Sequence, residues 1–111
     1  ETFHLLSRKR LKLLKKNSIV INTSRGEIID EQAIANLLFQ KKIGGAGLDV
    51  FEHEPQITPK LLESENVVLL PHISSATLES RISMGERVIK NISFFSQGKS
   101  PPDLINKLNY D

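Results

Sequence analysis

The order of structural elements is set by residues 18–51, SIVINTSRGEIIDEQAIANLLFQKKIGGAGLDVF. Its first part, Ser18 to Asn22, is short, apolar and β-branched, which predicts a buried strand. Asp30 is a natural N-cap for the helix expected next, because its carboxylate can accept a hydrogen bond from the first turn. One face of that helix is apolar and consists of Ala33, Ile34, Leu37 and Leu38.

The end of this helix and the next strand follow directly. Lys41 and Lys42 complement the helix dipole, and Gly44 and Gly45 should stop the helix. The run from Ala46 to Phe51 then predicts a second strand. Residues 18–51 therefore predict a strand–helix–strand unit.

The flanking sequence extends this pattern in both directions. Upstream, residues 7–16 predict a short helix with Ser7 as its N-cap. Downstream, residues 61–62 predict a turn of helix, and Asn66 to Leu70 predicts a third strand. Pro71 should end that strand, because proline cannot donate a hydrogen bond to a ladder.

A long helix is predicted from near Thr77 to near Gly98. Its expected inner stripe consists of Leu78, Ile82, Gly85, Ile89, Ile92 and Phe95. The following Lys99-Ser100-Pro101-Pro102 predicts an extended tail.

Short apolar strands that alternate with amphipathic helices indicate an α/β fold with a parallel sheet covered on both faces. Three such strands make one half of a doubly wound sheet. An open sheet of this width would leave an exposed edge, and the chain begins at Glu1 rather than Met. We therefore expect an excerpt whose partner half is missing.

Composition excludes several classes of protein. The 111 residues carry a net charge of +2 and no cysteine, which excludes disulfides, thiolate nucleophiles and cysteine-ligated metals. No apolar stretch approaches the ~20 residues of a membrane helix. The early basic run lacks interleaved aromatic residues, so it indicates a solvated helix face rather than a nucleic-acid site. We expect no metal, nucleic-acid or membrane partner.

Three chemically complementary side chains follow the three predicted strands: Arg25, Glu54 and His72. Parallel strands present their carboxyl ends at one edge, where ligands bind. A guanidinium matches a carboxylate, a histidine can pass a proton near neutral pH, and a nearby carboxylate can tune that histidine. The pattern indicates a shared site.

Structural interpretations of the same residues remain open. Arg25 can be a surface charge, His72 a turn histidine and Glu54 an exposed acid. Glu52 competes with Glu54 for the carboxylate role. Asp49 is anomalous, because an acid in an apolar strand end needs a buried partner or a ligand. A dinucleotide fingerprint at residues 45–50 is rejected, since a strand follows it rather than a helix.

Three motifs resemble a known family. Residues 21–31, INTSRGEIIDE, resemble the arginine signature of the D-isomer-specific 2-hydroxyacid dehydrogenases. Residues 45–55, GAGLDVFEHEP, resemble their glutamate signature, and residues 66–77, NVVLLPHISSAT, their histidine signature. Ser74 departs from the glycine that the family usually has there. The resemblance covers the chain end to end.

The resemblance implies a fragment of a two-domain enzyme that transfers a hydride between NAD or NADP and a small 2-keto or 2-hydroxy acid of the glyoxylate, hydroxypyruvate or phosphoglycerate class. Residues 1–98 would form the C-terminal half of the nucleotide-binding domain, which is the second half of a doubly wound, Rossmann-like parallel sheet. Residues 99–111 would form a tail returning toward the missing substrate domain. The resemblance also implies a homodimer. A cytoplasmic location is expected, since the absence of cysteine is compatible with a reducing cytosol.

The family's roles carry over by motif position. Arg25 would bind the substrate carboxylate, His72 would be the general acid in reduction, and Glu54 would pair with His72. Asp49 would contact the nicotinamide carboxamide. The full set implied to touch the cofactor is Thr23, Ser24, Arg25, Asp49, His72 and Ser75. Two alternatives are an NAD-sensing corepressor that recruits partners and a fragment that is inactive by itself.

Overall fold

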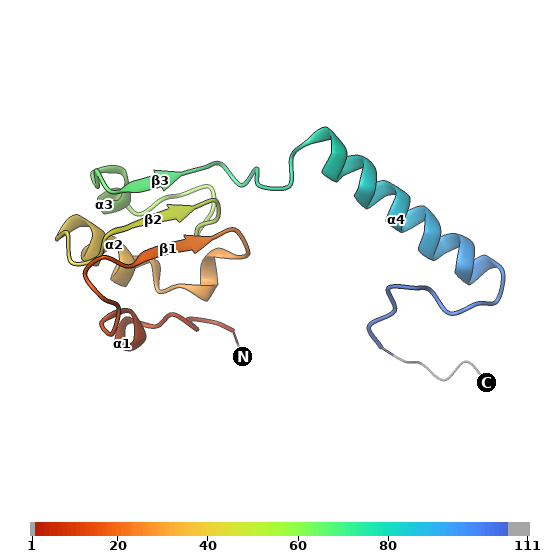
Figure 1. Ribbon diagram of the computed structural model, residues 1–111, viewed down its shortest axis with the longest axis horizontal. Helices are drawn as coiled ribbons and strands as arrows, with labels where there is room; N and C mark the ends of the chain where they lie inside the picture. Colours follow the sequence, from red (N-terminus) through yellow and green to blue (C-terminus); the bar gives the residue numbers. More distant parts are fainter. Residues whose placement is uncertain (1, 107–111) are drawn as a thin grey trace. The chain divides into compact units, whose positions relative to one another are not determined.

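The computed structural model describes residues 2–106. It divides into two compact units, Glu1–Ser74 and Ser75–Asp111. The first unit contains the sheet, and the second contains one long helix (Figure 1). Within the described residues, every helix is too short or too polar to span a bilayer.

The first unit is built on a sheet of three parallel strands in the order β1-β2-β3 (Figure 1). The strands are β1 (Ile19–Asn22), β2 (Gly45–Leu48) and β3 (Val67–Leu69). Ile21 pairs with Gly47, which pairs in turn with Val68. The predicted parallel, Rossmann-like sheet is confirmed, although each strand is shorter than predicted.

One face of the sheet is covered by helical segments, which are α1 (Arg8–Leu11), the 3-10 turn η1 (Gly26–Ile28), α2 (Glu31–Phe39) and α3 (Pro59–Leu62). The predicted N-cap of α2 is confirmed, since the Asp30 carboxylate accepts from the Ala33 amide at 2.9 Å. α1 ends earlier than predicted, because its run of like charges offers no stabilising i,i+4 ion pairs. The core joins helices and strands and includes Leu11, Val20, Ile34, Leu38, Leu48 and Leu61.

No element of the first unit covers the opposite face of the sheet in the described residues. Ile19, Ile21 and Val68 are 69%, 66% and 63% exposed, respectively. Side chains alternate across a strand, so Val20 and Asn22 are buried beneath the helices. The first unit supplies a single helical layer, so within this unit β1 is buried on one face only. The predicted cover on the second face stays a prediction.

The end of α2 also differs from the prediction. The helix ends at Phe39, and Lys41 takes the left-handed conformation with φ 52°. The Lys41 amide donates to the Leu38 carbonyl at 2.9 Å, which closes the helix without a glycine. Gly45 is needed for close strand packing instead, because a Cβ there would lie 2.8 Å from the Asn66 carbonyl oxygen.

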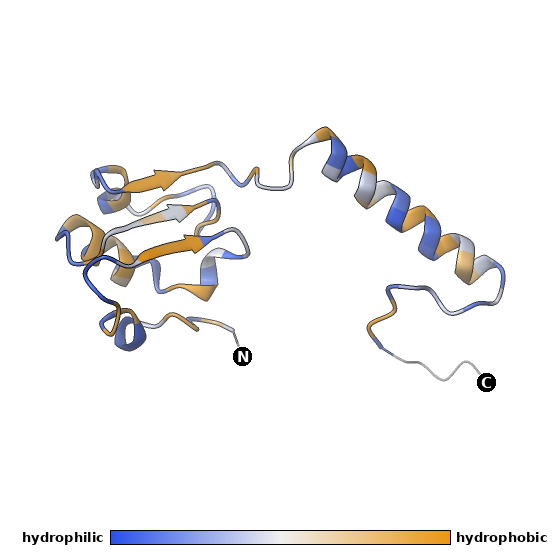
Figure 2. Ribbon diagram, in the orientation of Figure 1, coloured by the Kyte–Doolittle hydropathy of each residue, from blue (hydrophilic) through white to orange (hydrophobic). Residues whose placement is uncertain are grey.

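The second unit contains α4 (Leu78–Ser96). Thr77 caps it by accepting a hydrogen bond from the Ser80 amide at 3.2 Å. Apolar and polar positions alternate along α4 (Figure 2), but none of its residues is buried. The second unit alone does not bury the predicted inner stripe of α4, so the packing of this stripe stays a prediction.

The tail after α4 folds back along the helix rather than extending. Asp103 forms an ion pair with Arg87 and accepts a hydrogen bond from the Asn91 amide group at 2.6 Å. Residues 107–111 of the predicted tail lie outside the described residues. The domain boundary after Gly98 and the return to a substrate domain stay predictions.

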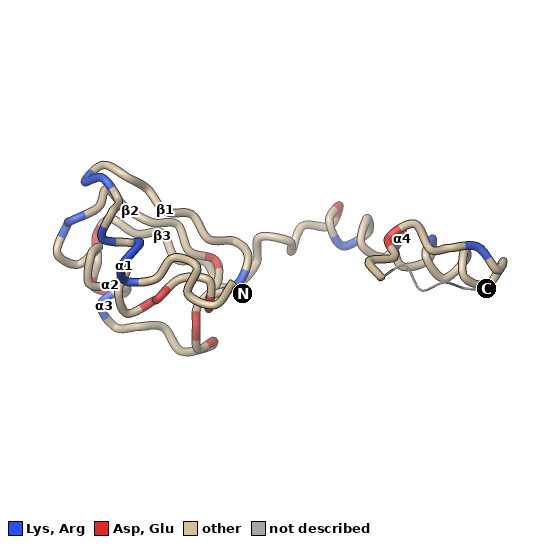
Figure 3. The backbone as a smooth tube through the Cα atoms, turned by 90° about the horizontal axis from the view of Figure 1, so that it is seen from below, with Lys and Arg blue, Asp and Glu red and all other residues tan. Residues whose placement is uncertain are grey.

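Basic residues gather at one end of the first unit. Figure 3 shows the backbone positions of Lys and Arg around α1 and around the turns that lead into β1 and β2. Lys41 in this group donates to Glu65 at 2.8 Å, an exposed pair that contributes little to stability. This is the end at which the strands begin, whereas ligands of parallel sheets bind where the strands end.

Candidate active site

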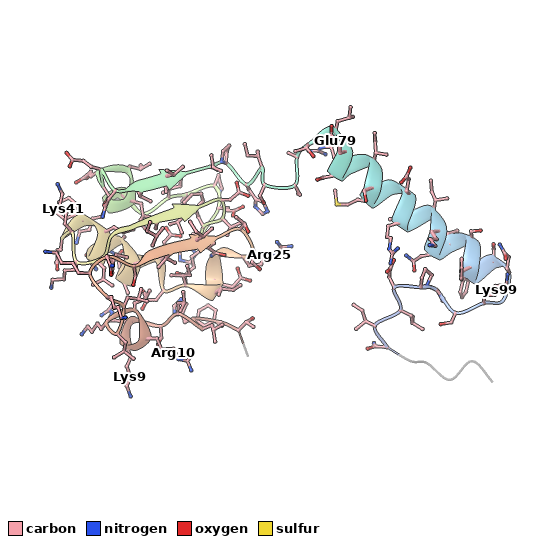
Figure 4. The ribbon with its side chains drawn as sticks, in the orientation of Figure 1. Lys9, Arg10, Arg25, Lys41, Glu79 and Lys99 are labelled. Atoms are coloured by element: carbon pink, nitrogen blue, oxygen red, sulfur yellow. The ribbon has the colours of Figure 1, made fainter. Side chains whose placement is uncertain are left out.

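Three loops leave the carboxyl ends of the strands: residues 23–26 after β1, residues 49–58 after β2 and residues 70–74 after β3. Because the strands are parallel, these loops open on one edge of the sheet. Figure 4 shows the Arg25 side chain projecting beyond the end of β1, at the opposite end of the unit from Lys41. The candidate site is this edge.

The first loop is held by a side chain to which the sequence analysis gave no role. Asn22 is 6% exposed at the end of β1. Its amide group donates to the Arg25 carbonyl at 2.9 Å, and its side-chain oxygen accepts from the Ser24 amide at 3.1 Å. Arg25 itself is exposed, and its Nη1 donates to the Ser24 carbonyl at 2.7 Å. A buried polar residue at a strand end was the signal that could have identified Asn22.

The second and third loops meet through Glu54 and His72. His72 Nδ1 lies 2.8 Å from Glu54 Oε2, and Glu54 Oε1 accepts from the Phe51 amide at 3.0 Å. The hydrogen bond with His72, followed by the one from Phe51, holds the pKa of Glu54 below its usual value. An ionised carboxylate can only accept, so Nδ1 carries the proton of this bond. The pairing implied by the motifs is therefore present.

His72 has an uncommon backbone conformation, with φ 56° in the left-handed region. Such residues persist only where the surroundings hold them, and they cluster at functional sites. Within residues 2–106, the Nε2 atom of His72 has no hydrogen-bond partner. The side chain is 46% exposed, so this nitrogen can meet a ligand.

Glu52 does not compete with Glu54 for the histidine. Its carboxylate lies 2.8 Å from His4 Nε2 and accepts from the Glu31 amide at 3.3 Å. His4, to which the sequence analysis gave no chemistry, therefore has a structural partner. Glu54, and not Glu52, is therefore the acid that contacts His72.

Asp49 has the buried partners that its position demanded. It is 1% exposed, and its two carboxylate oxygens accept from the Ile73 and Ser74 amides at 2.8 and 2.9 Å. Burial raises the pKa of Asp49, but these backbone hydrogen bonds, together with the Ser74 side chain and the nearby His72, leave the pKa below its usual value. Asp49 thus fixes the loop that carries His72. Its predicted contact with a nicotinamide stays a prediction.

Gly26 joins the first loop to the second. A Cβ on Gly26 would lie 2.0 Å from both the carbonyl carbon and the carbonyl oxygen of Phe51. Real Cβ atoms do not approach backbone so closely, so only glycine allows this contact. The backbone next to Arg25 is therefore packed directly on the start of the loop that carries Glu54.

The structure brings some of the predicted residues together and leaves others apart. Glu54 and His72 are hydrogen-bonded to each other, and Asp49 accepts hydrogen bonds from the two residues that follow His72. Arg25 lies on the same edge with no hydrogen bond or ion pair to Glu54 or His72 in the described part of the chain. Thr23 and Ser24 are exposed beside Arg25.

Ser75 belongs to the second unit, and its cofactor contact stays a prediction. No group of three or more His, Asp or Glu in residues 2–106 is arranged to hold a metal ion.

The sequence is similar to that of known reductases. It is 51% identical over 107 residues to a glyoxylate reductase of Thermococcus litoralis, and 48% identical to one of Pyrococcus horikoshii. Each match covers 96% of this chain but 32% of the relative. The chain therefore spans about a third of the length of these relatives.

Solved structures show the same likeness. An NADPH-dependent glyoxylate/hydroxypyruvate reductase from Sinorhizobium meliloti, in complex with NADP and malonate, matches with a TM-score of 0.79 and 39% identity over 89% of this chain and 31% of that chain. D-mandelate dehydrogenase from Rhodotorula graminis matches with a TM-score of 0.86 and 32% identity over 96% of this chain and 31% of that chain. The fold is thus shared with enzymes of this kind.

The family model that matches this sequence describes the NAD binding domain of D-isomer specific 2-hydroxyacid dehydrogenases, and the match covers residues 1–74, the unit that holds all three strand-end loops. With the sheet, the Glu54–His72 pair and this match in agreement, the chain belongs to the D-isomer specific 2-hydroxyacid dehydrogenase family, and residues 1–74 are part of its NAD-binding domain.

Proposed function

We propose that this chain carries the proton-transfer residues of an NAD(P)-dependent enzyme that reduces small 2-keto acids to 2-hydroxy acids. Glyoxylate is the favoured substrate, because the relatives at 51% and 48% identity are glyoxylate reductases. The chain spans about a third of those relatives, so the proposal concerns the intact enzyme of which these residues form the catalytic edge.

The proposal rests on the contact between Glu54 Oε2 and His72 Nδ1 at 2.8 Å. With Nδ1 occupied by a carboxylate, the ring is held in place and its Nε2 is left to carry the proton that the reaction moves. His72 Nε2 would donate this proton to the keto oxygen of the substrate during reduction, and would recover it from the hydroxyl in the reverse direction.

Arg25 would hold the substrate for this step. Its guanidinium offers paired donors that match a carboxylate, and its only hydrogen bond in the described structure is to a neighbouring carbonyl. Binding of the substrate carboxylate to Arg25 would place the keto carbon near the edge where His72 lies.

The donors at this edge fit the nicotinamide end of NAD or NADP. The exposed hydroxyl groups of Thr23 and Ser24 flank Arg25, and Ser75 is proposed to join them. When bound, the nicotinamide would supply the hydride that the keto carbon accepts. A cytoplasmic homodimer is proposed on the family resemblance alone.

The test is reduction of glyoxylate, hydroxypyruvate and the keto acid of phosphoglycerate by the intact protein, with NADH and NADPH compared. His72→Ala should lower kcat by about 10²- to 10⁴-fold, the usual contribution of a positioned acid. His53→Ala is the matched control, because His53 is an exposed histidine next to Glu54, and its kcat should not change. Absence of keto-acid reduction by the wild type, or full turnover by His72→Ala, would overturn the proposal.

A further inference from the structure

Glu31 is a buried acid to which the proposed reaction assigns no task. It is the first residue of α2 and is 7% exposed. Its Oε2 accepts from the Glu52 amide at 2.6 Å, and its Oε1 accepts from both the amide and the hydroxyl of Thr58, at 3.0 and 2.7 Å. One buried carboxylate thus takes three hydrogen bonds from a single loop.

These hydrogen bonds hold both ends of the loop that carries Glu54. Glu52 and Thr58 bracket the loop, and Glu54 lies between them. The contact is reciprocal at the first end, because the Glu52 carboxylate accepts from the Glu31 amide at 3.3 Å. The same carboxylate lies 2.8 Å from His4 Nε2, so the N-terminal segment is tied to this end as well.

We call the hydrogen bonds that Glu31 accepts from Glu52 and Thr58 the Glu31 clamp. The helix that carries Glu31 is rigidly packed. Ala33, Ile34 and Leu38 of α2 are buried in the core, so the helix fixes the position of its first residue. A negative charge is also favourable at a helix N-terminus. The loop between Glu52 and Thr58 contains no helix or strand, and besides this clamp its Glu54 carboxylate is held by the Phe51 amide and by His72.

We infer that Glu31 is a positioning residue, which holds the loop from Glu52 to Thr58 so that Glu54 stays within hydrogen-bonding distance of His72. The expected effect of Glu31 on turnover rests on the proposed function. Glu31 acts through Glu54 and touches neither substrate nor cofactor. A displacement of about 1 Å in a catalytic group can cost about 10²-fold in rate, so loss of the clamp should lower turnover without weakening substrate binding.

A double-mutant cycle in the intact enzyme tests this. Glu31→Ala should lower kcat by about 10- to 100-fold and change KM for the keto acid by less than about twofold, because the group that it displaces works in the transition state. In a Glu54→Gln background, Glu31→Ala should lower kcat by less than about threefold, since residues that act as a unit are not additive. Glu63→Ala, which removes an exposed glutamate from the same unit, is the control and should leave kcat unchanged.

Two results would overturn the inference: an equal loss of kcat from Glu31→Ala in both backgrounds, or no loss in either. If Glu31→Ala does not fold, Thr58→Val takes its place, because it removes only the hydroxyl that donates to Glu31. Its loss of kcat should be smaller and should likewise vanish in the Glu54→Gln background.

A structural measurement separates this inference from the proposed function. In a crystal structure of Glu31→Gln or Glu31→Ala, the loop from Glu52 to Thr58 should be displaced and the Glu54–His72 contact should be longer than 2.8 Å. If the wild type reduces no keto acid, the proposed function fails, and this measurement alone decides the inference. An unmoved loop with the contact intact would refute it.

Discussion

The Oε2 atom of Glu54 and the Nδ1 atom of His72 lie 2.8 Å apart, although the two residues are 18 positions apart and follow different strands. The contact exists because two parallel strands end at the same edge and because each loop is separately fixed. Asp49 fixes the loop of His72, and the Phe51 amide orients the carboxylate of Glu54. Several hydrogen bonds to the backbone of the two loops therefore hold Glu54 and His72 in contact.

Glu54→Gln should remove a pH-dependent contribution to stability. The pKa of Glu54 is below its usual value because of the hydrogen bond with His72. A lowered carboxyl pKa stabilises the fold above the unfolded value of about 4.3, and this stabilisation is lost as pH falls through the folded pKa. The difference in unfolding free energy between wild type and Glu54→Gln, measured by urea titration, should be largest near neutral pH and should shrink below about pH 4.

The same variant should be slower in keto-acid reduction. The expected loss in kcat is about tenfold or more, but below the ~10²- to 10⁴-fold that the proton-transfer step supplies, because His72 remains. Glu63→Gln serves as the control for loss of one exposed carboxylate. A stability difference that stays constant from pH 7 to acid pH would contradict the role given to the Glu54–His72 contact.

Arg25→Lys should raise KM for the keto acid by about 10- to 100-fold, the value of one or two charge-assisted hydrogen bonds. Lysine keeps the charge but loses the planar fork that matches a carboxylate. Arg10→Lys is the control, because Arg10 is an exposed arginine whose Nη1 donates to a backbone carbonyl in the same way. Initial-rate kinetics that show equal KM values for Arg25→Lys and wild type would remove Arg25 from the substrate site.

Asp49→Asn should lower kcat by about 10- to 100-fold, because a shift of the His72 loop by about 1 Å misplaces the acid. An asparagine can replace one acceptor oxygen, but its amide group would face the second backbone donor, either Ile73 or Ser74. Initial rates with varied NADH and NADPH separate two roles. A fall in kcat at constant cofactor KM supports loop fixation, whereas a raised cofactor KM alone would instead support the direct nicotinamide contact implied by the family resemblance.

The sequence predicted the parts of this structure that depend on chain order and local pattern. The three strands, the Asp30 cap and the shared edge for Arg25, Glu54 and His72 follow from hydrophobic periodicity and the rule for parallel strand ends. Prediction of the Glu54–His72 contact depended on the family motifs, because the residues alone left Glu52 as a competing candidate.

The parts that the sequence did not predict depend on contacts between distant segments. Glu31 lay inside a quoted motif, yet its three hydrogen bonds reach residues 21 and 27 positions away. Asp49 was noticed as an anomaly, but its backbone partners belong to a loop that only the fold brings near. Within the first unit only one layer covers the sheet. An apolar β-branched strand has the same pattern whether one or two layers cover it, so the pattern of β1 does not say how many layers lie in this unit.

Gly26 and Gly85 should respond to alanine in opposite directions. At Gly26 the new Cβ would lie 2.0 Å from the backbone of Phe51, which cannot move aside as a side chain can, so Gly26→Ala should cost about 1–3 kcal/mol or more in unfolding free energy. At Gly85, within α4, a Cβ would meet nothing within 4 Å. Gly85→Ala should stabilise by about 0.5–1 kcal/mol, because alanine loses less backbone entropy in a helix.

Thermal unfolding of the two variants beside the wild type measures both effects. Gly26→Ala should also lower kcat, because it pushes the Arg25 loop away from the loop of Glu54, whereas Gly85→Ala should leave kcat unchanged. Wild-type stability in Gly26→Ala would mean that the two loops are not packed backbone to backbone. A Gly85→Ala variant that is less stable than the wild type would mean that another surface covers α4 at that position in the intact protein.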